Sequence, residues 1–281
     1  HVLAEATASR FKRSTRTLRG TPGEVGRVLL SRWELDNLEL ALRLWHGGET
    51  ALREMLPGEP IVYGGEIRKI ADATSLEEVI LLMKDTPYFT PLSLSMKLYK
   101  DKQSVFYLEV ALERDYYRRL LNSVHRLGGS DAQRAERIVG SEIDMLNLSW
   151  LARLLEYHEV KFAEFHQFGI PGPGEISRKL VSAQGETSLE EITSEFLSRR
   201  IPGEAKVTQT LERISLLEDI IVQMSIDLAT SLLAGYPFSI TGVLAYYLLI
   251  RIELRNLRCV LVSKVHGEKE GEILSRLVGL R

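Results

Sequence analysis

The sequence has 281 residues, with 36 basic and 38 acidic side chains and a formal charge of −2. This balance gives no support for a protein that binds nucleic acid or an anionic membrane through bulk charge. The 44% of hydrophobic residues are typical of a globular chain rather than a disordered one. Cys259 is the only cysteine, which excludes an internal disulfide and a cysteine-based metal site and is typical of a cytosolic protein.

Residues 1–32 are predicted to form helix and loop, and they carry a basic run without an intervening acid. The run consists of Arg10, Lys12, Arg13, Arg16 and Arg19. It is either a contact for nucleic acid or lipid, or a solvated helix face, and the solvated face is the more common explanation. Residues 20–23 break the chain, and the next helix runs through Asn37 to Gly47 and Gly48, a typical helix end.

Two similar loops and sets of short helices follow. A proline- and glycine-rich loop over residues 57–65 precedes short helices over residues 66–84. Residues 104–110 resemble a short strand, but their continuation favours a helix. A long helix over residues 142–158 comes next, and a second proline- and glycine-rich loop over residues 169–174 again precedes short helices.

The closing part holds an uncharged stretch, residues 228–250, long enough to cross a membrane. Gly235 and Pro237 interrupt it with turn residues. We therefore predict two helices joined by a turn, over residues 214–234 and 239–265, rather than a membrane span.

One phrase recurs on three of these helices: an acid followed three residues later by Asn-Leu. The three acid–asparagine pairs are Glu34 and Asn37, Asp144 and Asn147, and Glu253 and Asn256. The asparagines are 110 and 109 residues apart, a spacing typical of internal repetition. Asparagine is unfavourable inside a helix, so its recurrence indicates a hydrogen bond to a neighbouring element.

Apolar side chains of helical period accompany the second and third phrases. These stripes are Ile143, Leu146, Trp150, Leu154 and Tyr157, then Tyr247, Ile250, Leu254, Leu257 and Leu261. Both stripes predict that the helices bury one face.

Two further short segments are repeated, in the same order relative to the acid–asparagine phrases. Residues 74–78 recur verbatim at 187–191, and Gly65-Glu66-Ile67 recurs at 174–176 and 271–273. We predict an all-α chain of three repeat units. Their bounds are residues 1–84, 85–197 and 198–281. Equal unit lengths predict that about 23 residues are missing at the start of the first unit, and the third unit is also expected to be truncated.

Motifs for catalysis or cofactor binding are absent from the sequence. It has no phosphate loop, no Gly-x-Gly-x-x-Gly, no His-Glu-x-x-His, no Glu-x-x-His and no Gly-x-Ser-x-Gly. His158 and His166 share a helical stretch, but surface or packing roles explain them better than metal binding. Cys259 lacks a nearby histidine and is predicted to be a small core residue. We therefore predict no catalytic, cofactor-binding or metal-binding residues.

The sequence leaves two possible roles open for three tryptophans and two arginines. Trp33, Trp45 and Trp150 are either core residues or a partner-binding patch, with core packing favoured. Arg43 and Arg153 follow their asparagines by six residues, and they either contact a partner or pair with the repeated acids, with intramolecular pairing favoured.

The helix over residues 237–258 resembles the C-terminal signature of the C subunit of A-type and V-type rotary ATPases. The eukaryotic relative of that protein is the V-type d subunit. Residues 34–38 and 142–148 are similar to the phrases of that family's other two repeats. The resemblance covers about residues 29–280, and it rests on three phrases in order rather than on a catalytic motif.

This resemblance implies a non-catalytic rotor subunit built as an all-helical funnel with three-fold pseudosymmetry and a central cavity. Such a protein lies peripherally on the cytoplasmic face of the membrane. It joins the D and F subunits of the central stalk to the proteolipid ring and transmits torque during proton or other ion transport and ATP synthesis. No cofactor, no directly bound nucleotide and no nucleic acid is expected. The six acid and asparagine positions are then a structural signature of the repeats.

Two other interpretations remain open from the sequence. One is a helical-repeat protein-binding scaffold unrelated to rotary ATPases. The other is an all-helical enzyme that uses an acid cluster such as Glu34 and Asp144, which would gather these acids in one deep pocket.

Overall fold

The computed structural model describes residues 2–56, 61–157, 162–182, 189–200, 210–235 and 239–279, all in helices, turns and loops without a strand. The predicted all-α class is confirmed. The chain divides into two compact units, His1–Leu127 and Gly128–Arg281. This boundary falls inside the second predicted repeat unit. Compactness and sequence repetition divide a chain by different criteria, so the three-unit division stays a prediction.

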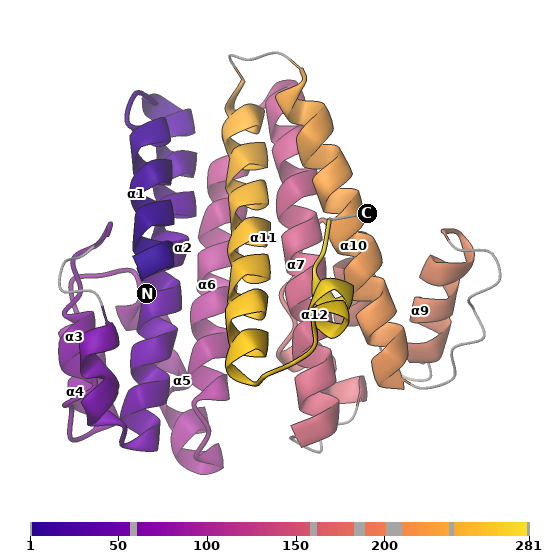
Figure 1. Ribbon diagram of the computed structural model, residues 1–281. Helices are drawn as coiled ribbons and strands as arrows, with labels where there is room; N and C mark the ends of the chain where they lie inside the picture. Colours follow the sequence, from indigo (N-terminus) through magenta and orange to yellow (C-terminus); the bar gives the residue numbers. More distant parts are fainter. Residues whose placement is uncertain are drawn as a thin grey trace. The chain divides into compact units, whose positions relative to one another are not determined.

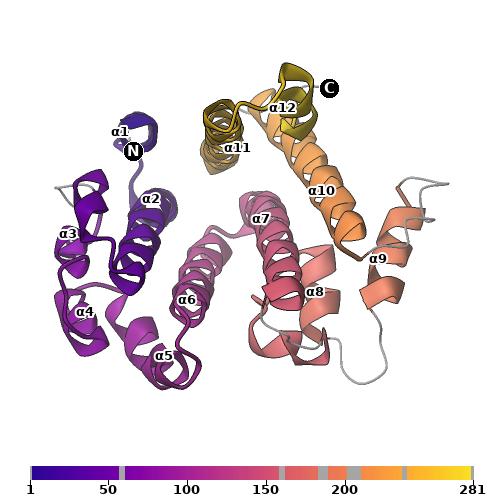
Figure 2. The ribbon, with the colours of Figure 1, turned by 60° about the horizontal axis from the view of Figure 1, so that its bottom comes forward.

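Unit 1 is built around one long helix, α2 (Figure 1). Its elements are α1 (Val2–Thr15), α2 (Gly20–Gly47), the 3₁₀ helix η1 (Thr50–Met55), α3 (Ile67–Ile70), α4 (Leu76–Leu82), α5 (Phe89–Lys102) and α6 (Phe106–His125). Helix α2 packs against α1, α3 and α6, and α5 packs against α6, as Figure 2 shows from another side. Of residues 104–110, for which the sequence left strand or helix open, 106–110 form the start of α6, so the helical prediction is confirmed there.

The two ends of α2 follow from local backbone chemistry. The helix begins at Gly20, so the predicted break at residues 20–23 is wrong. Pro22 fits the first turn because the N–H groups there have no partner within the helix. At the other end, Gly48 adopts a left-handed φ of 70°, and its N–H donates to the carbonyl of Trp45 at 3.2 Å. The predicted end at Gly47 and Gly48 is confirmed.

Unit 2 has three long helices, α7, α10 and α11, that pack on one another. Its elements are α7 (Gly129–Tyr157), η2 (Phe162–Gln167), α8 (Glu175–Ser182), α9 (Leu189–Ser198), α10 (Thr210–Leu233), α11 (Ile240–Val265) and α12 (Glu270–Arg276). Helix α8 packs against α7, and α9 against both α8 and α10. Fully buried Leu148, Leu217 and Leu244 contribute to the core from the three long helices.

The uncharged stretch forms parts of α10 and α11, in agreement with the two predicted helices. Among the helices of the described residues, none combines the length and the apolar character that crossing a membrane requires.

The order of elements after α2 recurs after α7: a 3₁₀ helix followed by two short helices. After α11, the described chain contains only α12. All three copies of Gly-Glu-Ile lie at the first turn of a short helix: residues 65–67 at α3, 174–176 at α8 and 271–273 at α12. The third copy follows its asparagine by 15 residues, whereas the first two follow theirs by 28 and 27.

Candidate functional site: asparagine clasps and a buried charge cluster

Asn147 on α7 binds the backbone of the loop before α8. Its Nδ2 donates to the Ile170 carbonyl at 2.9 Å, and its Oδ1 accepts from the Ile170 N–H at 2.8 Å. Nδ2 also donates to Ser177 Oγ at 2.9 Å. Asn147 is completely buried. We call this two-way pairing of an asparagine amide with one backbone residue an asparagine clasp, and it satisfies polar groups that no water reaches.

Asn256 on α11 forms a second clasp of the same kind. Its Nδ2 donates to the Val278 carbonyl at 2.9 Å, and its Oδ1 accepts from the Val278 N–H at 3.1 Å. The two clasps bind residues at nearly the same distance along the chain, since Ile170 and Val278 follow their asparagines by 23 and 22 residues. The sequence interpretation of a helical asparagine bonded to a neighbouring element thus describes both positions.

Asn37 behaves differently. Its side chain is half-buried on α2, and no hydrogen bond joins it to the part of the chain that the structure describes. The counterpart of Ile170 would fall near residue 60, which lies outside the described residues. A clasp at Asn37 is therefore still a prediction.

Two of the three repeated acids accept backbone N–H groups. Asp144 accepts from Ile176 at 3.3 Å and from Ser177 at 2.6 Å, and so caps the first turn of α8. Glu34 accepts from the N–H groups of Val62 at 2.7 Å and Tyr63 at 3.0 Å. Glu253 is exposed and makes no hydrogen bond or ion pair with the described residues.

Burial is the main influence on the pKa of the two bonded acids. It raises the pKa of the Asp144 carboxyl, against the hydrogen bonds from Ser177 that lower it. It also raises the pKa of Glu34, against the N–H groups of Tyr63 and Val62. Each acid binds backbone groups of its own unit, Glu34 in unit 1 and Asp144 in unit 2. These hydrogen bonds give each acid a structural role within its own unit.

A buried charge cluster that the sequence analysis missed joins α2 to α6. On α2 it contains Arg32, Asp36, Glu39 and Arg43, and on α6 Glu109 and Glu113. The Arg32 guanidinium binds both Glu113 oxygens, through Nη1 and, at 2.6 Å, through Nη2. Arg32 also binds Asp36 at 2.9 Å, and Arg43 Nε donates to Glu109 at 2.5 Å. The 4-3-4 spacing of charges on α2 was the available signal, because such residues share a helix face.

Glu39 is the member of the cluster with the poorest pairing. Its side chain lies 3.7 Å from Arg43, and its Oε1 has no hydrogen-bond partner among the described residues. Burial raises its pKa well above the usual value of 4.5, and the charge of Glu113 raises the pKa further, against the attraction of Arg32. The cluster therefore favours the protonated form of Glu39 more than solvent would.

Core packing is confirmed for Trp33 and Trp150 and intramolecular pairing for Arg43, whereas Trp45 is half-buried and the pairing of Arg153 stays a prediction. Trp33 and Trp150 are buried, and Trp45 donates its indole N–H to the Ala73 carbonyl at 2.9 Å. Arg43 pairs within the chain, but with Glu109 rather than with the repeated acid Glu34.

Other expectations need correction. Cys259 is half-buried rather than a core residue. Leu257 and Leu261 of the third stripe are 39% and 53% exposed, whereas Tyr247, Ile250 and Leu254 are buried. The exposed members of the stripe are therefore the last two along α11. His158 lies outside the described residues, so its relation to His166 stays untested.

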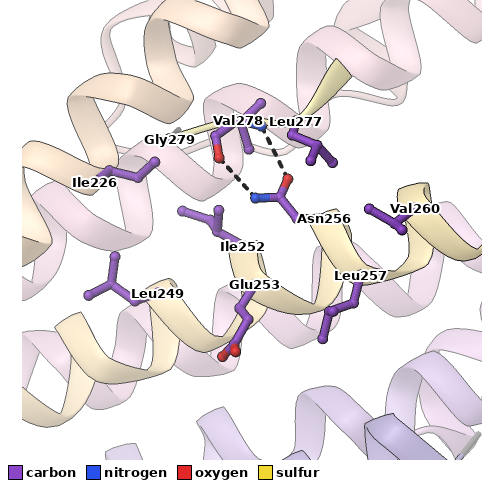
Figure 3. Close-up of a pocket in the computed structure, with 10 residues that line it drawn as sticks. All are labelled: Ile226, Leu249, Ile252, Glu253, Asn256, Leu257, Val260, Leu277, Val278 and Gly279. Atoms are coloured by element: carbon purple, nitrogen blue, oxygen red, sulfur yellow. Dashed lines mark hydrogen bonds between the residues drawn. The ribbon is translucent and has the colours of Figure 1, made fainter. Parts of the chain in front are cut away.

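Within the described residues, no group of histidine, cysteine, aspartate and glutamate side chains has an arrangement suitable for a metal ion. A shallow groove of about 340 Å³ lies beside the second clasp, lined mostly by aliphatic side chains of α10, α11 and residues 277–279 (Figure 3). In Figure 3 the Glu253 carboxylate points away from the Val278 segment that Asn256 binds.

Comparison with known proteins identifies relatives across most of the chain. The C subunit of the A-type ATP synthase of Methanosphaera stadtmanae is 21% identical over 84% of this chain. The proteins of the same name from Thermococcus kodakarensis and Thermococcus onnurineus are 25% and 28% identical, each over 90% of this chain.

The matches cover 63% of the Methanosphaera protein and 67% of each Thermococcus protein, so the chain spans about two thirds of the length of these relatives. A family model described as ATP synthase (C/AC39) subunit matches residues 1–276. Because this match extends over nearly the whole sequence, the chain belongs to the ATP synthase (C/AC39) subunit family.

Proposed function

We propose that this chain is a non-catalytic rotor subunit of an A-type or V-type ATPase or ATP synthase. It joins the D and F subunits of the central stalk to the proteolipid ring and transmits torque between them during ion transport. The observation that carries the proposal is the family match over residues 1–276, with relatives named as the C subunit of A-type ATP synthases. The place of action is the cytoplasmic face of the membrane, where the chain is bound peripherally.

Rigid connections between helices support a mechanical role. The Arg32–Glu113 and Arg43–Glu109 pairs connect α2 to α6 within unit 1. The Asn147 clasp and the Asp144 cap connect α7 to α8 within unit 2. Apart from Arg43, whose side chain is 50% exposed, these groups are buried, and buried groups are costly to separate because each would be left without a partner. Such connections resist deformation under load, as a torque-bearing protein requires.

We further propose that residues 1–84, 85–197 and 198–281 are three related units that surround a central cavity for the stalk. The matching clasps of Asn147 and Asn256 support this proposal. The order of a 3₁₀ helix and two short helices after both α2 and α7 supports it as well. In this proposal Glu34, Asn37, Asp144, Asn147, Glu253 and Asn256 are structural positions of the repeat.

Reconstitution of the rotary complex with and without this chain tests the coupling role. ATP hydrolysis and ATP-driven ion uptake into vesicles are measured separately, with the other subunits taken from the same organism. Without the chain we expect hydrolysis to persist and ion uptake to be lost, and addition of the chain restores uptake. Full uptake in its absence would contradict the proposal, and a helical scaffold unrelated to rotary ATPases would produce that result.

A further inference from the structure

The buried charge cluster of unit 1 contains more acids than bases. It lies between α2 and α6, which pack on one another (Figure 2). Its six members are Arg32, Asp36, Glu39, Arg43, Glu109 and Glu113. Full ionisation would leave an excess of negative charge in a place that water reaches poorly, and such an excess is costly. A proton on one of the acids relieves it.

Glu39 is the acid with an unused oxygen. It is 7% exposed, and its Oε1 has no hydrogen-bond partner among the described residues. Its Oε2 lies 3.7 Å from Arg43 Nη2. The other elements that pack on α2 are α1, α3 and η1, and within the described residues none of their charged side chains pairs with Glu39. The remaining charges that act on it are Arg32 and Asp36 of α2 and Glu109 and Glu113 of α6.

The two connections between α2 and α6 differ in strength. Arg32 is buried and uses both terminal nitrogens to bind the two Glu113 oxygens. Arg43 is 50% exposed and binds Glu109 through Nε at 2.5 Å. A buried two-point pair holds its geometry better than a half-exposed single bond. The Arg43–Glu109 pair is therefore the connection that opens first when the cluster is disturbed.

We propose that Glu39 is a proton-operated latch between α2 and α6. While Glu39 is protonated, Arg43 binds Glu109 and the latch is closed. When the proton passes to solvent, the Glu39 carboxylate draws the Arg43 guanidinium towards α2 and repels the two glutamates of α6. The Arg43–Glu109 pair then opens and water reaches the start of α6. The Arg32–Glu113 pair keeps the two helices together at the other side of the cluster.

The direction of the switch follows from the surroundings of Glu39. Burial raises the pKa of its carboxyl, and the charge of Glu113 raises the pKa further. The closed latch is therefore the acid form. Its contribution is complete below the unfolded pKa and is lost as the pH rises through the folded pKa.

Exchange of backbone amide hydrogens, corrected for its intrinsic pH dependence, tests the latch on the full chain. In the wild type we expect the protection of residues 108–113 to fall about tenfold or more between about pH 5 and about pH 9. Residues 217–225 of α10 are the internal reference, because they belong to unit 2. Their protection should change less than about threefold. An equal fall in both segments would overturn the proposal, because the whole chain would then be opening.

Three variants separate the latch from a general effect of pH. Glu39→Gln keeps the size of the side chain without its ionisation, so the protection of residues 108–113 should stay within about threefold over this range. Glu54→Gln is the matched control, because Glu54 is 74% exposed, and it should behave as the wild type does. Arg43→Gln removes the pair that opens, so at about pH 5 it should show the low protection that the wild type shows at about pH 9.

Three results would overturn the latch: no fall in the wild type, a fall that persists in Glu39→Gln, or full protection in Arg43→Gln. The measurement uses this chain alone and concerns a contact within unit 1. Its outcome is therefore independent of the coupling role.

Discussion

Among the clasp asparagines, substitution of Asn147 is expected to cost the chain more stability. Its amide satisfies both backbone groups of Ile170, which is itself buried. Asn256 makes the same pair of bonds in a half-buried setting that water reaches. Asn37 is left out of this comparison, because the counterpart of Ile170 falls outside the described residues. The two clasp asparagines therefore have different energetic weights.

Substitution of each clasp asparagine by alanine measures these weights. We expect Asn147→Ala to lower the free energy of unfolding by about 3–5 kcal/mol, because two buried backbone groups lose their partner. Asn256→Ala is expected to cost about 1–2 kcal/mol. Urea denaturation of the two variants gives the values. Equal losses at the two positions would contradict this order.

Glu39 predicts a pH dependence of stability. Its folded pKa is raised above the usual 4.5, so the folded chain holds a proton that the unfolded chain releases above about pH 4.5. Stability from this group is complete below the unfolded pKa and falls as the pH rises toward the folded pKa. We expect Glu39→Gln to remove this fall. Between pH 4 and pH 8 the variant should therefore gain stability relative to the wild type as the pH rises.

Denaturant titrations at several pH values measure this difference, with Glu54→Gln as the control. Glu54 is 74% exposed, so its substitution is expected to leave the difference between variant and wild type nearly constant. Parallel stability curves for the wild type and Glu39→Gln would show that the buried cluster does not retain the proton on Glu39.

The sequence predicted single residues well where the signal was local. The clasp asparagines and the buried Trp33 and Trp150 followed from helical spacing and residue type. Leu257 and Leu261 did not, because periodicity identifies an apolar face but not the element that covers it. The Arg32–Glu113 pair joins residues 81 positions apart, and no local pattern predicts which distant acid an arginine meets.

At the scale of elements, α7 approaches closely to Gly174, the residue before α8. A Cβ atom at this position would lie 2.1 Å from Asp144 Oδ1 and 2.5 Å from the Gly140 carbonyl oxygen. Only glycine permits this approach without a shift of backbone. The short distance allows Asp144 to reach the N–H groups of α8, so the cap and the glycine depend on each other.

Gly174→Ala tests this close contact. We expect it to destabilise the chain by about 2–3 kcal/mol, because α8 must move away from Asp144. Gly242→Ala is the control, since a Cβ there meets nothing within 4 Å. Alanine in α11 is expected to be neutral or to add up to about 1 kcal/mol of stability. Thermal and urea unfolding compare the two variants, and a neutral effect at Gly174 would contradict the account of the α7–α8 contact.

Element identities were more predictable than their starts. Helix α6 and the α10–α11 pair followed from length, periodicity and the turn residue Gly235. The start of α2 was misplaced because Pro22 and two glycines normally indicate a break, yet a first helical turn tolerates them. The third Gly-Glu-Ile lies at the start of a short helix, as the other two copies do, but it lies closer to its asparagine along the chain.

Across the whole molecule, the sequence predicted the all-α class, and its repeated phrases led to the family to which the chain belongs. The family match and the internal connections of each unit support a stiff, non-catalytic coupling protein. The repeat phrases suggest three related units, while compactness divides the chain into two. Repeat units are defined by sequence similarity and compact units by packing contacts, so the boundaries of the two need not coincide.

The most direct measurement is a calorimetric titration of the purified chain with the stalk D–F pair from the same organism. The proposed role predicts saturable binding with one D–F pair per chain and a dissociation constant of about 1 µM or lower. The same titration with an unrelated helical protein should give no binding. Absence of D–F binding at about 50 µM, with the chain folded, would contradict the central claim that this protein couples the stalk to the ring.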